Sequence, residues 1–231
     1  MIDALTVCVD YAEFLALGIK RWREGLRSLT VVTAPHDEAT QELAHAEGAQ
    51  LHVTEAFYQD GAAFNKGRAL EEARERLPRG GWVLLFDADI VPEPGWVYKV
   101  SEARPEIGNL YSAKRVDCRK LEDLESPTLP ELPDDCGVGY FQLYHSEDPV
   151  AQARPLIDTF WIHAGNYDDR LKERWPRENR HWLPIRLVHV GERENWFGRG
   201  KRKEWEAMQR ERRRRGGRWD HERIDWGKVP S

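Results

Sequence analysis

Apolar runs alternate with amphipathic segments over the first ninety or so positions of the chain. Nearly continuous apolar runs, rich in β-branched residues, lie at residues 5–11, 29–35, 50–57 and 82–89. Runs of this length, bounded by turn residues, predict buried strands. Apolar positions at helical spacing, followed by Gly or Pro, predict helices over residues 11–26, 36–48 and 64–78.

This order of strands and helices predicts a parallel sheet that is covered by helices on both faces. Beyond Pro94 the alternation stops. We expect antiparallel strands at 109–118 and 139–145, a loop rich in Pro and acidic residues between them, and a final strand at 183–191. The predicted fold class is therefore α/β, with a mostly parallel, Rossmann-like first half and a smaller antiparallel region after it.

Polar side chains follow several of the predicted strands at the point where each strand ends. Asp10, Thr33, Asp37, Asp87 and Asp89 all lie at or just beyond those ends. In α/β sheets of this kind, ligands bind in the crevice outside the carboxyl ends of the strands. We therefore expect these residues to mark a ligand site.

Asp87 and Asp89 are separated by one residue and would point to the same side of an extended chain. Both carboxylates could then contact one metal ion, directly or through water. Carboxylate and phosphate oxygens suit Mg²⁺ or Mn²⁺, which would bridge to a diphosphate. The alternative is two turn carboxylates at the end of a strand, with Pro92 and Pro94 marking the exit.

The segment VLLFDADIVPEPGW resembles the metal-binding segment of glycosyltransferases with the GT-A fold, in particular family 2-like enzymes. VCVDYAEFLALGI resembles their opening strand, VVTAPHDEAT their second strand and turn, FNKGRALEEA the helix before the metal strand, and LVHVGERENWFGR a late segment with a histidine. The order of these motifs carries the resemblance.

The resemblance implies that Asp87 and Asp89 hold the metal, or that Asp87 faces the ribose while Asp89 is the direct ligand. It implies His189 as a third ligand, since an imidazole suits Mn²⁺ better than Mg²⁺. An ordinary strand histidine is the alternative. Asp10 and Asp37 are implied contacts of the base and ribose, and uridine is the expected base because it is the commonest in the fold.

Asn65, Lys66 and Gly67 stand at the start of a predicted helix. Helix N-termini attract anions, Gly67 would permit close approach, and Lys66 would add positive charge, so the three residues fit a diphosphate. Lys66 is equally compatible with a solvated position on the helix.

Asp168 and Asp169 lie in the region where family 2-like chains carry the catalytic base. An inverting enzyme needs a carboxylate that accepts the proton of the acceptor hydroxyl as it attacks. The alternative for either aspartate is a helix N-cap. Trp161, Trp175 and Trp182, together with Trp196, are candidates for stacking on an acceptor.

The composition of the 231-residue chain is that of a soluble protein, with 40% hydrophobic and 32% charged residues and a net charge of −5. No apolar run is long enough to span a bilayer, and we see no signal peptide. Cys8, Cys118 and Cys136 form no C-x-x-C pair, which fits a reducing cytoplasm, or a host cytoplasm for a viral protein.

About half of residues 199–218 are Lys or Arg. We expect one catalytic domain at 1–198, with a nucleotide-sugar half (1–100) and an acceptor half (101–198), followed by a basic C-terminal extension at 199–231. The extension offers nucleic acid, for example a modified DNA base, as an alternative acceptor to a glycan or a small glycoside. A solvated segment or one that lies on anionic lipid is the other interpretation.

These features predict a metal-dependent glycosyltransferase that uses a nucleotide-diphosphate sugar and Mn²⁺ or Mg²⁺. A sugar-nucleotide nucleotidyltransferase is the first alternative, although the chain lacks the Gly-rich loop with Arg and Lys that such enzymes carry after the first strand. A binding module that has lost its chemistry is the second.

Overall fold

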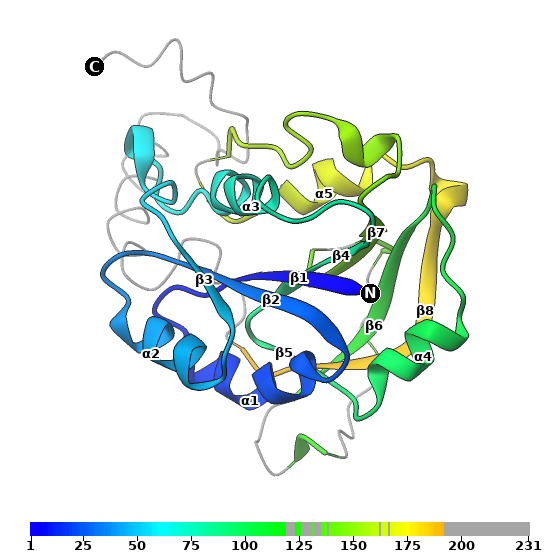
Figure 1. The fold of residues 1–231 in the computed structure, drawn as a ribbon, viewed down its shortest axis with the longest axis horizontal. Helices are drawn as coiled ribbons and strands as arrows, with labels where there is room; N and C mark the ends of the chain where they lie inside the picture. Colours follow the sequence, from blue (N-terminus) through cyan, green and yellow to red (C-terminus); the bar gives the residue numbers. More distant parts are fainter. Residues whose placement is uncertain are drawn as a thin grey trace, which may run out of the picture.

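A computed structural model describes residues 1–118, 123–125, 131, 135–137, 139–161, 163–165 and 167–191. The described strands form one eight-stranded sheet in the order β3-β2-β1-β4-β7-β6-β8-β5 (Figure 1). The strands are β1 (Ile2–Val7), β2 (Leu26–Thr33), β3 (Gln50–Val53), β4 (Trp82–Asp87), β5 (Ile90–Pro92), β6 (Leu110–Asp117), β7 (Phe141–His145) and β8 (Arg180–His189).

Helices cover both faces of this sheet. The α-helices are α1 (Ala12–Arg23), α2 (Glu38–Ala46), α3 (Lys66–Arg74), α4 (Trp96–Glu102) and α5 (Tyr167–Lys172), with short 3₁₀ helices at Gln59–Gly61, Val150–Gln152 and Arg177–Asn179. Buried residues of α1, α2 and α4 belong to one hydrophobic cluster, and those of α3 and α5 to another. The two groups of helices lie on opposite sides of the sheet (Figure 1).

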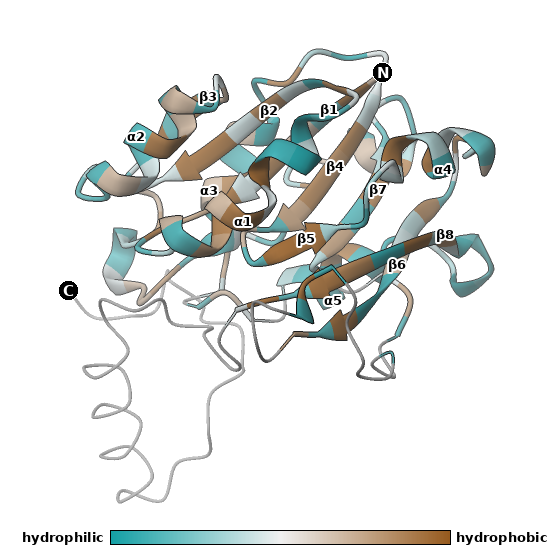
Figure 2. Cartoon of the chain, turned by 90° about the horizontal axis from the view of Figure 1, so that it is seen from below, coloured by the Kyte–Doolittle hydropathy of each residue, from teal (hydrophilic) through white to brown (hydrophobic). Residues whose placement is uncertain are grey.

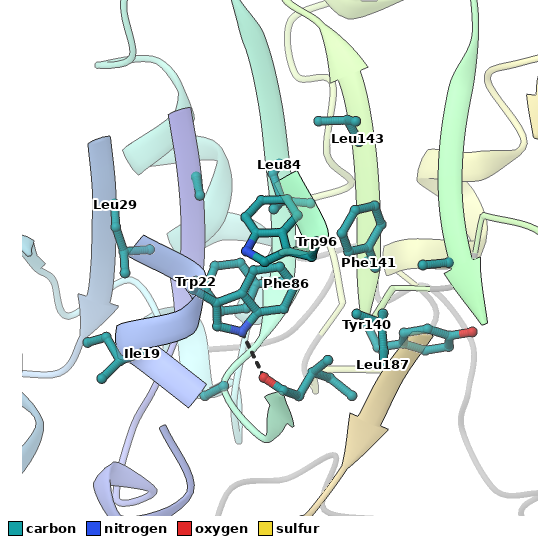
Figure 3. Close-up of a cluster of buried hydrophobic side chains, with 14 of the residues drawn as sticks. Ile19, Trp22, Leu29, Leu84, Phe86, Trp96, Tyr140, Phe141, Leu143 and Leu187 are labelled. Atoms are coloured by element: carbon teal, nitrogen blue, oxygen red, sulfur yellow. Dashed lines mark hydrogen bonds between the residues drawn. The ribbon is translucent and has the colours of Figure 1, made fainter. Parts of the chain in front are cut away.

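The cluster beneath α1 and α4 is built around tryptophans. Trp22 stacks on Phe86 with ring centroids 4.2 Å apart, and its indole N–H donates to the carbonyl of Ile90 at 2.7 Å (Figure 3). Trp96 meets Trp22 edge-on at 5.0 Å. Burying one such side chain stabilises the fold by roughly 1.5–3 kcal/mol. Apolar residues also dominate β4 and β5 in Figure 2.

The predicted alternation is confirmed in β1 to β4, which run parallel to one another. β1 begins earlier than predicted, at Ile2, and includes the buried Asp3. The carboxylate of Asp3 accepts hydrogen bonds from Arg27 Nε at 2.8 Å and Ser28 Oγ at 2.7 Å. A paired carboxylate is tolerated in a strand, which a hydrophobic pattern does not reveal.

The second half of the chain continues the same sheet. β7 is antiparallel to β4, and β6 is antiparallel to β7, as predicted. β8 lies parallel to β6, and β5 is antiparallel to β8. The halves 1–100 and 101–198 therefore share one sheet, because β4 pairs with β7. Residues 192–198 and the basic C-terminal extension lie outside the described residues.

Within the described ranges, no helix is both long enough and apolar enough to cross a membrane.

Candidate active site

One edge of the sheet collects the predicted polar residues. β1, β2, β3 and β4 are parallel, and because β7 reverses direction, β6 and β8 again end at the same edge as β4. The edge therefore carries Asp10, Asp37, Asp87 and His189 of the predicted set, and also Asp117, the last residue of β6. This is the edge at which α/β sheets bind ligands.

Asp87, the last residue of β4, forms an ion pair with Lys66, the first residue of α3. Lys66 Nζ also lies 5.2 Å from the centre of the Tyr167 ring. Burial alone lowers the pKa of Lys66, but the charge of Asp87 and the contact with Tyr167 outweigh it, so that this pKa lies above its ordinary value. Lys66 is thus a buried cation at the site and not a solvated helix residue.

Asn65 and Gly67 join the start of α3 to the loop that precedes α5. Asn65 Oδ1 accepts from the backbone N–H of Arg68 at 2.9 Å and caps the helix, while its Nδ2 donates to the carbonyl of Thr159 at 2.8 Å. A Cβ at position 67 would overlap the carbonyl oxygen of Asp158. The space that Gly67 leaves is therefore filled by this loop, whereas we predicted that it would admit a ligand.

Asp89 lies in the turn after β4 and not in an extended strand. The expectation that an extended chain carries Asp87 and Asp89 on the same side is therefore wrong in its premise. Asp89 Oδ2 instead lies 3.3 Å from His189 Nε2, at the end of β8. The two aspartates thus have separate partners, Lys66 for Asp87 and His189 for Asp89.

His189 lies between two carboxylates. Its Nδ1 is 3.1 Å from Asp117 Oδ1, on the side away from Asp89. The side chains of Asp89, Asp117 and His189 are 15%, 11% and 12% exposed. Burial lowers the pKa of His189, but the hydrogen bond and charge of Asp89, and then Asp117, raise it above its ordinary value.

Asp37 organises the other end of the edge. One of its oxygens accepts from the backbone N–H of Thr40 at 3.1 Å and caps α2, as a helix-starting aspartate should. The other oxygen accepts from the backbone N–H of Asp10 at 2.7 Å and from Thr33 Oγ1 at 3.2 Å. These bonds hold Asp10 at a φ of 55°, in the left-handed region that non-glycine residues rarely adopt.

Two aromatic rings stand beside Asp10. His36 Nε2 lies 3.3 Å from Asp10 Oδ2, and the centroids of the His36 and Tyr58 rings are 5.9 Å apart. Burial, followed by the charges of Asp10 and Asp37, raises the pKa of Tyr58 to about 12. Planar rings next to hydrogen-bonding carboxylates form a surface that can accept a nucleobase.

Asp168 and Asp169 both lie in the first turn of α5, but they face different surroundings. Asp168 Oδ2 accepts from the backbone N–H of Gly139 at 3.0 Å. Burial, and then the charges of Asp169 and Asp87, raise the pKa of Asp168. Asp169 forms an ion pair with Lys172 at 2.7 Å, and half of its side chain is exposed. Asp168 thus lies partly buried near the charge of Asp87, whereas Asp169 faces the surface.

The residues beside His189 fit a divalent metal ion. An imidazole nitrogen and a carboxylate oxygen face each other, and this donor set suits Mn²⁺. A Cβ at Gly191 would overlap the carboxylate of Asp89, so glycine there leaves the carboxylate its space. In the part of the chain that is described, no three His, Cys, Asp or Glu side chains form a complete metal cage. The remaining ligands would have to come from water or a bound diphosphate.

The predicted aromatic residues of the acceptor half divide into core and surface. Trp161 and Trp175 are buried, at 4% and 0% exposure, and belong to the cluster beneath α3 and α5. Trp182 on β8 is 36% exposed. Trp196 lies outside the described residues. Trp161 and Trp175 therefore pack the core, and Trp182 keeps an open face.

Sequence reasoning missed Asp117, Tyr58 and Tyr167 as members of the site. Asp117 lies at the end of the predicted strand 109–118 and Tyr58 follows the predicted strand 50–57, so the rule that selected Asp10 and Asp87 could have selected them. That rule needed the direction of β6 in the sheet, which pairing with β7 and β8 sets. Tyr167 contacts Lys66 through a long-range packing contact that no local pattern encodes.

The chain has the GT-A fold, as the sequence predicted, and shares it with solved structures of glycosyltransferases. No protein-family model and no curated protein matches the chain. Solved structures match the chain by their fold. GalNAc-T7 with UDP, GalNAc and Mn²⁺ has a TM-score of 0.57 and 10% identity, covering 86% of this chain and 44% of its own.

Two further solved structures have the same fold. The mannosyltransferase PcManGT from Pyrobaculum calidifontis, in complex with GDP-Man and Mn²⁺, has a TM-score of 0.55 and 14% identity over 84% of this chain and 58% of its own. Glucosyl-3-phosphoglycerate synthase from Mycobacterium tuberculosis, with Mn²⁺, UDP and phosphoglyceric acid, has a TM-score of 0.52 and 16% identity over 91% of this chain and 75% of its own. The chain thus spans less than two thirds of the length of GalNAc-T7 and of PcManGT.

Proposed function

We propose that the chain is a metal-dependent glycosyltransferase that moves a sugar from a nucleotide-diphosphate sugar to an acceptor hydroxyl. The observation that carries the proposal is the pairing of Asp89 with His189 at the carboxyl edge of a GT-A sheet, next to the partly buried ion pair of Asp87 and Lys66. The similar structures hold Mn²⁺ with UDP or GDP-Man, which supports this class of donor.

Asp89 and His189 would hold the ion, with Asp87 as a further ligand or as a ribose contact. When bound, Mn²⁺ or Mg²⁺ would neutralise the charge that develops on the leaving diphosphate. Lys66 already neutralises Asp87 and lies at the start of α3, where it can also attract the diphosphate. Asn65 and Gly67 contribute by fixing the start of this helix against the loop at Asp158.

The nucleoside would occupy the end of the site near Asp10. Asp37 uses its carboxylate on backbone N–H groups, so its role is to hold Asp10, and the side chain of Asp10 would contact the ribose or base. The rings of His36 and Tyr58 offer a flat surface beside it. Uridine remains the expected base, and guanosine is the alternative that the mannosyltransferase suggests.

Asp168 is the base that we propose for an inverting reaction. A raised pKa brings a carboxylate closer to the value at which it both accepts and returns a proton. Asp169, which pairs with Lys172 at the surface, would only support the start of α5. The acceptor would be a glycan or a small glycoside that approaches from the side of α5.

Nucleic acid as an acceptor stays a prediction, because the basic C-terminal extension lies outside the described residues. The cytoplasmic location, inferred from the cysteines, stays one as well. A nucleotidyltransferase or a binding module without activity would also bind a sugar nucleotide, and the products distinguish these two from a glycosyltransferase. A glycosyltransferase releases a nucleoside diphosphate, a nucleotidyltransferase releases a nucleoside triphosphate when pyrophosphate is supplied, and a binding module releases nothing.

A thermal-shift panel tests the proposal. UDP- and GDP-sugars are added to the full chain with and without Mn²⁺, and to the variants Asp89→Ala and Glu147→Ala. Glu147 is an exposed acid at the opposite edge of the sheet and serves as the control. We expect stabilisation that requires both donor and Mn²⁺, that survives Glu147→Ala and that Asp89→Ala removes. If no sugar nucleotide stabilises the protein in a Mn²⁺-dependent manner, the proposal is contradicted.

A further inference from the structure

Asp117 is a nearly buried carboxylate at the site that no part of the proposed reaction uses. It ends β6, its side chain is 11% exposed, and its Oδ1 lies 3.1 Å from His189 Nδ1. We propose that Asp117 is the positioning residue that fixes the ring of His189 as a metal ligand. This inference rests on the proposed function, because it concerns the same ion.

The backbone holds the three side chains of this cluster in register. Asp117 pairs directly with His189 across β6 and β8, and His189 pairs with Ile90 across β8 and β5. Backbone N–H groups on both sides complete the frame, from Cys118 to the carbonyl of His189 at 2.8 Å and from Val190 to the carbonyl of Asp89 at 2.9 Å. The imidazole is therefore held between two carboxylates by three neighbouring strand ends.

The two nitrogens of the ring have different tasks in such an arrangement. A histidine binds a metal through the lone pair of one nitrogen, while the other nitrogen carries the proton and donates a hydrogen bond to a partner. A carboxylate only accepts, so Asp117 keeps a proton on Nδ1, and Nε2 is the nitrogen that would give up its proton to solvent and present its lone pair when the ion binds. Nε2 is the atom that faces Asp89 Oδ2 at 3.3 Å. Asp117 thereby orients the His189 ring so that its Nε2 lone pair points toward Asp89, and His189 and Asp89 would bind the ion together.

A purely structural role for Asp117 makes a different prediction. An ion pair that only ties β6 to β8 would affect the stability of the fold and leave the metal affinity of the folded protein unchanged. A carboxylate partner also makes the imidazole a stronger ligand, and replacing such partners typically lowers metal affinity by about 10–100-fold. Metal affinity therefore separates the two roles, and stability does not.

The experiment measures Mn²⁺ affinity by electron paramagnetic resonance of free Mn²⁺, with the full chain and saturating UDP or GDP. Asp117→Asn keeps the size of the side chain and removes its charge. Asp3→Asn is the matched control, because Asp3 is also a buried, paired carboxylate but lies at the opposite end of the sheet. We expect about 10–100-fold weaker Mn²⁺ binding in Asp117→Asn, and wild-type binding in Asp3→Asn.

A second measurement does not depend on the folding of any variant. Long-range ¹H–¹⁵N spectra of the wild-type protein with Mg²⁺ and UDP report which nitrogen of His189 carries the proton. We expect the proton on Nδ1. A proton on Nε2, or wild-type Mn²⁺ affinity in Asp117→Asn, would overturn the role of Asp117 and leave the glycosyltransferase proposal standing. No Mn²⁺ binding by the wild-type protein would overturn both.

Discussion

The contact between α3 and the loop before α5 can be tested by one added methyl group. In Gly67→Ala the new Cβ would overlap the carbonyl oxygen of Asp158 and lie 3.4 Å from the Cβ of Tyr167. The loop cannot simply withdraw. The backbone N–H groups of Leu156 and Ile157 donate to the carboxylate of Glu71 at 3.0 and 3.2 Å.

The cost can be assembled from three contributions. Forcing a methyl group into a packed contact costs about 1–3 kcal/mol. Moving the loop also weakens the hydrogen bond from Asn65 to Thr159, which is worth about 1 kcal/mol. Alanine in place of glycine in a helix returns up to about 1 kcal/mol. We therefore expect Gly67→Ala to lower the free energy of unfolding by about 1–3 kcal/mol.

Urea unfolding followed by circular dichroism measures this difference. Arg68→Ala is the control at the next position, because it removes only solvent-accessible contacts with Asp60 and Gln59 and should change the free energy by no more than about 1 kcal/mol. If Gly67→Ala unfolds at the same urea concentration as Arg68→Ala, the loop does not pack on α3 as described. The positioning of Asp168, at the end of the same loop, would then need revision.

Three further predictions concern residues at this edge. Asp168→Asn should lower the transfer rate by about 10²–10⁴-fold, as expected for a lost base, whereas Asp169→Asn should retain most of it. Because the folded pKa of Asp168 is raised, this residue contributes stability at low pH that is lost as the pH rises through that pKa. The free energy of unfolding in urea, measured between about pH 4 and 7, should therefore fall less with rising pH in Asp168→Asn than in the wild type, and an equal fall would contradict the raised pKa of Asp168. Gly191→Ala should displace the carboxylate of Asp89 and weaken Mn²⁺ binding at least about tenfold in the calorimeter. Unchanged binding would exclude Asp89 as a ligand.

Much of the fold could be predicted because local sequence patterns determine the elements of its first half. The apolar runs of β1, β2 and β4 reflect burial at each position, and Gly or Pro residues mark where the helices between them end. The candidate site followed from one rule, which placed polar residues such as Asp10 and Asp87 at the carboxyl edge of the sheet. Both residues lie at that edge.

The remaining features depend on contacts between distant residues. The neighbours Asp117 and His189 are separated by 72 positions, and they meet only because β8 lies parallel to β6. α5 has six residues, too few for a periodic pattern. Gly67 makes room for a loop more than ninety positions away, and its local sequence has no sign of that partner. Local patterns therefore reveal the edge, but not the pairing of side chains along it.

The central claim is that this edge activates a nucleotide-diphosphate sugar with the help of a metal ion at Asp89 and His189. The most direct test is chromatographic measurement of the nucleotide that is released from UDP- and GDP-sugars, with and without Mn²⁺. The account predicts Mn²⁺-dependent release of UDP or GDP by the wild-type protein and none by Asp89→Ala. Equal release without metal, release of a nucleoside triphosphate when pyrophosphate is supplied, or no release from any donor would contradict it.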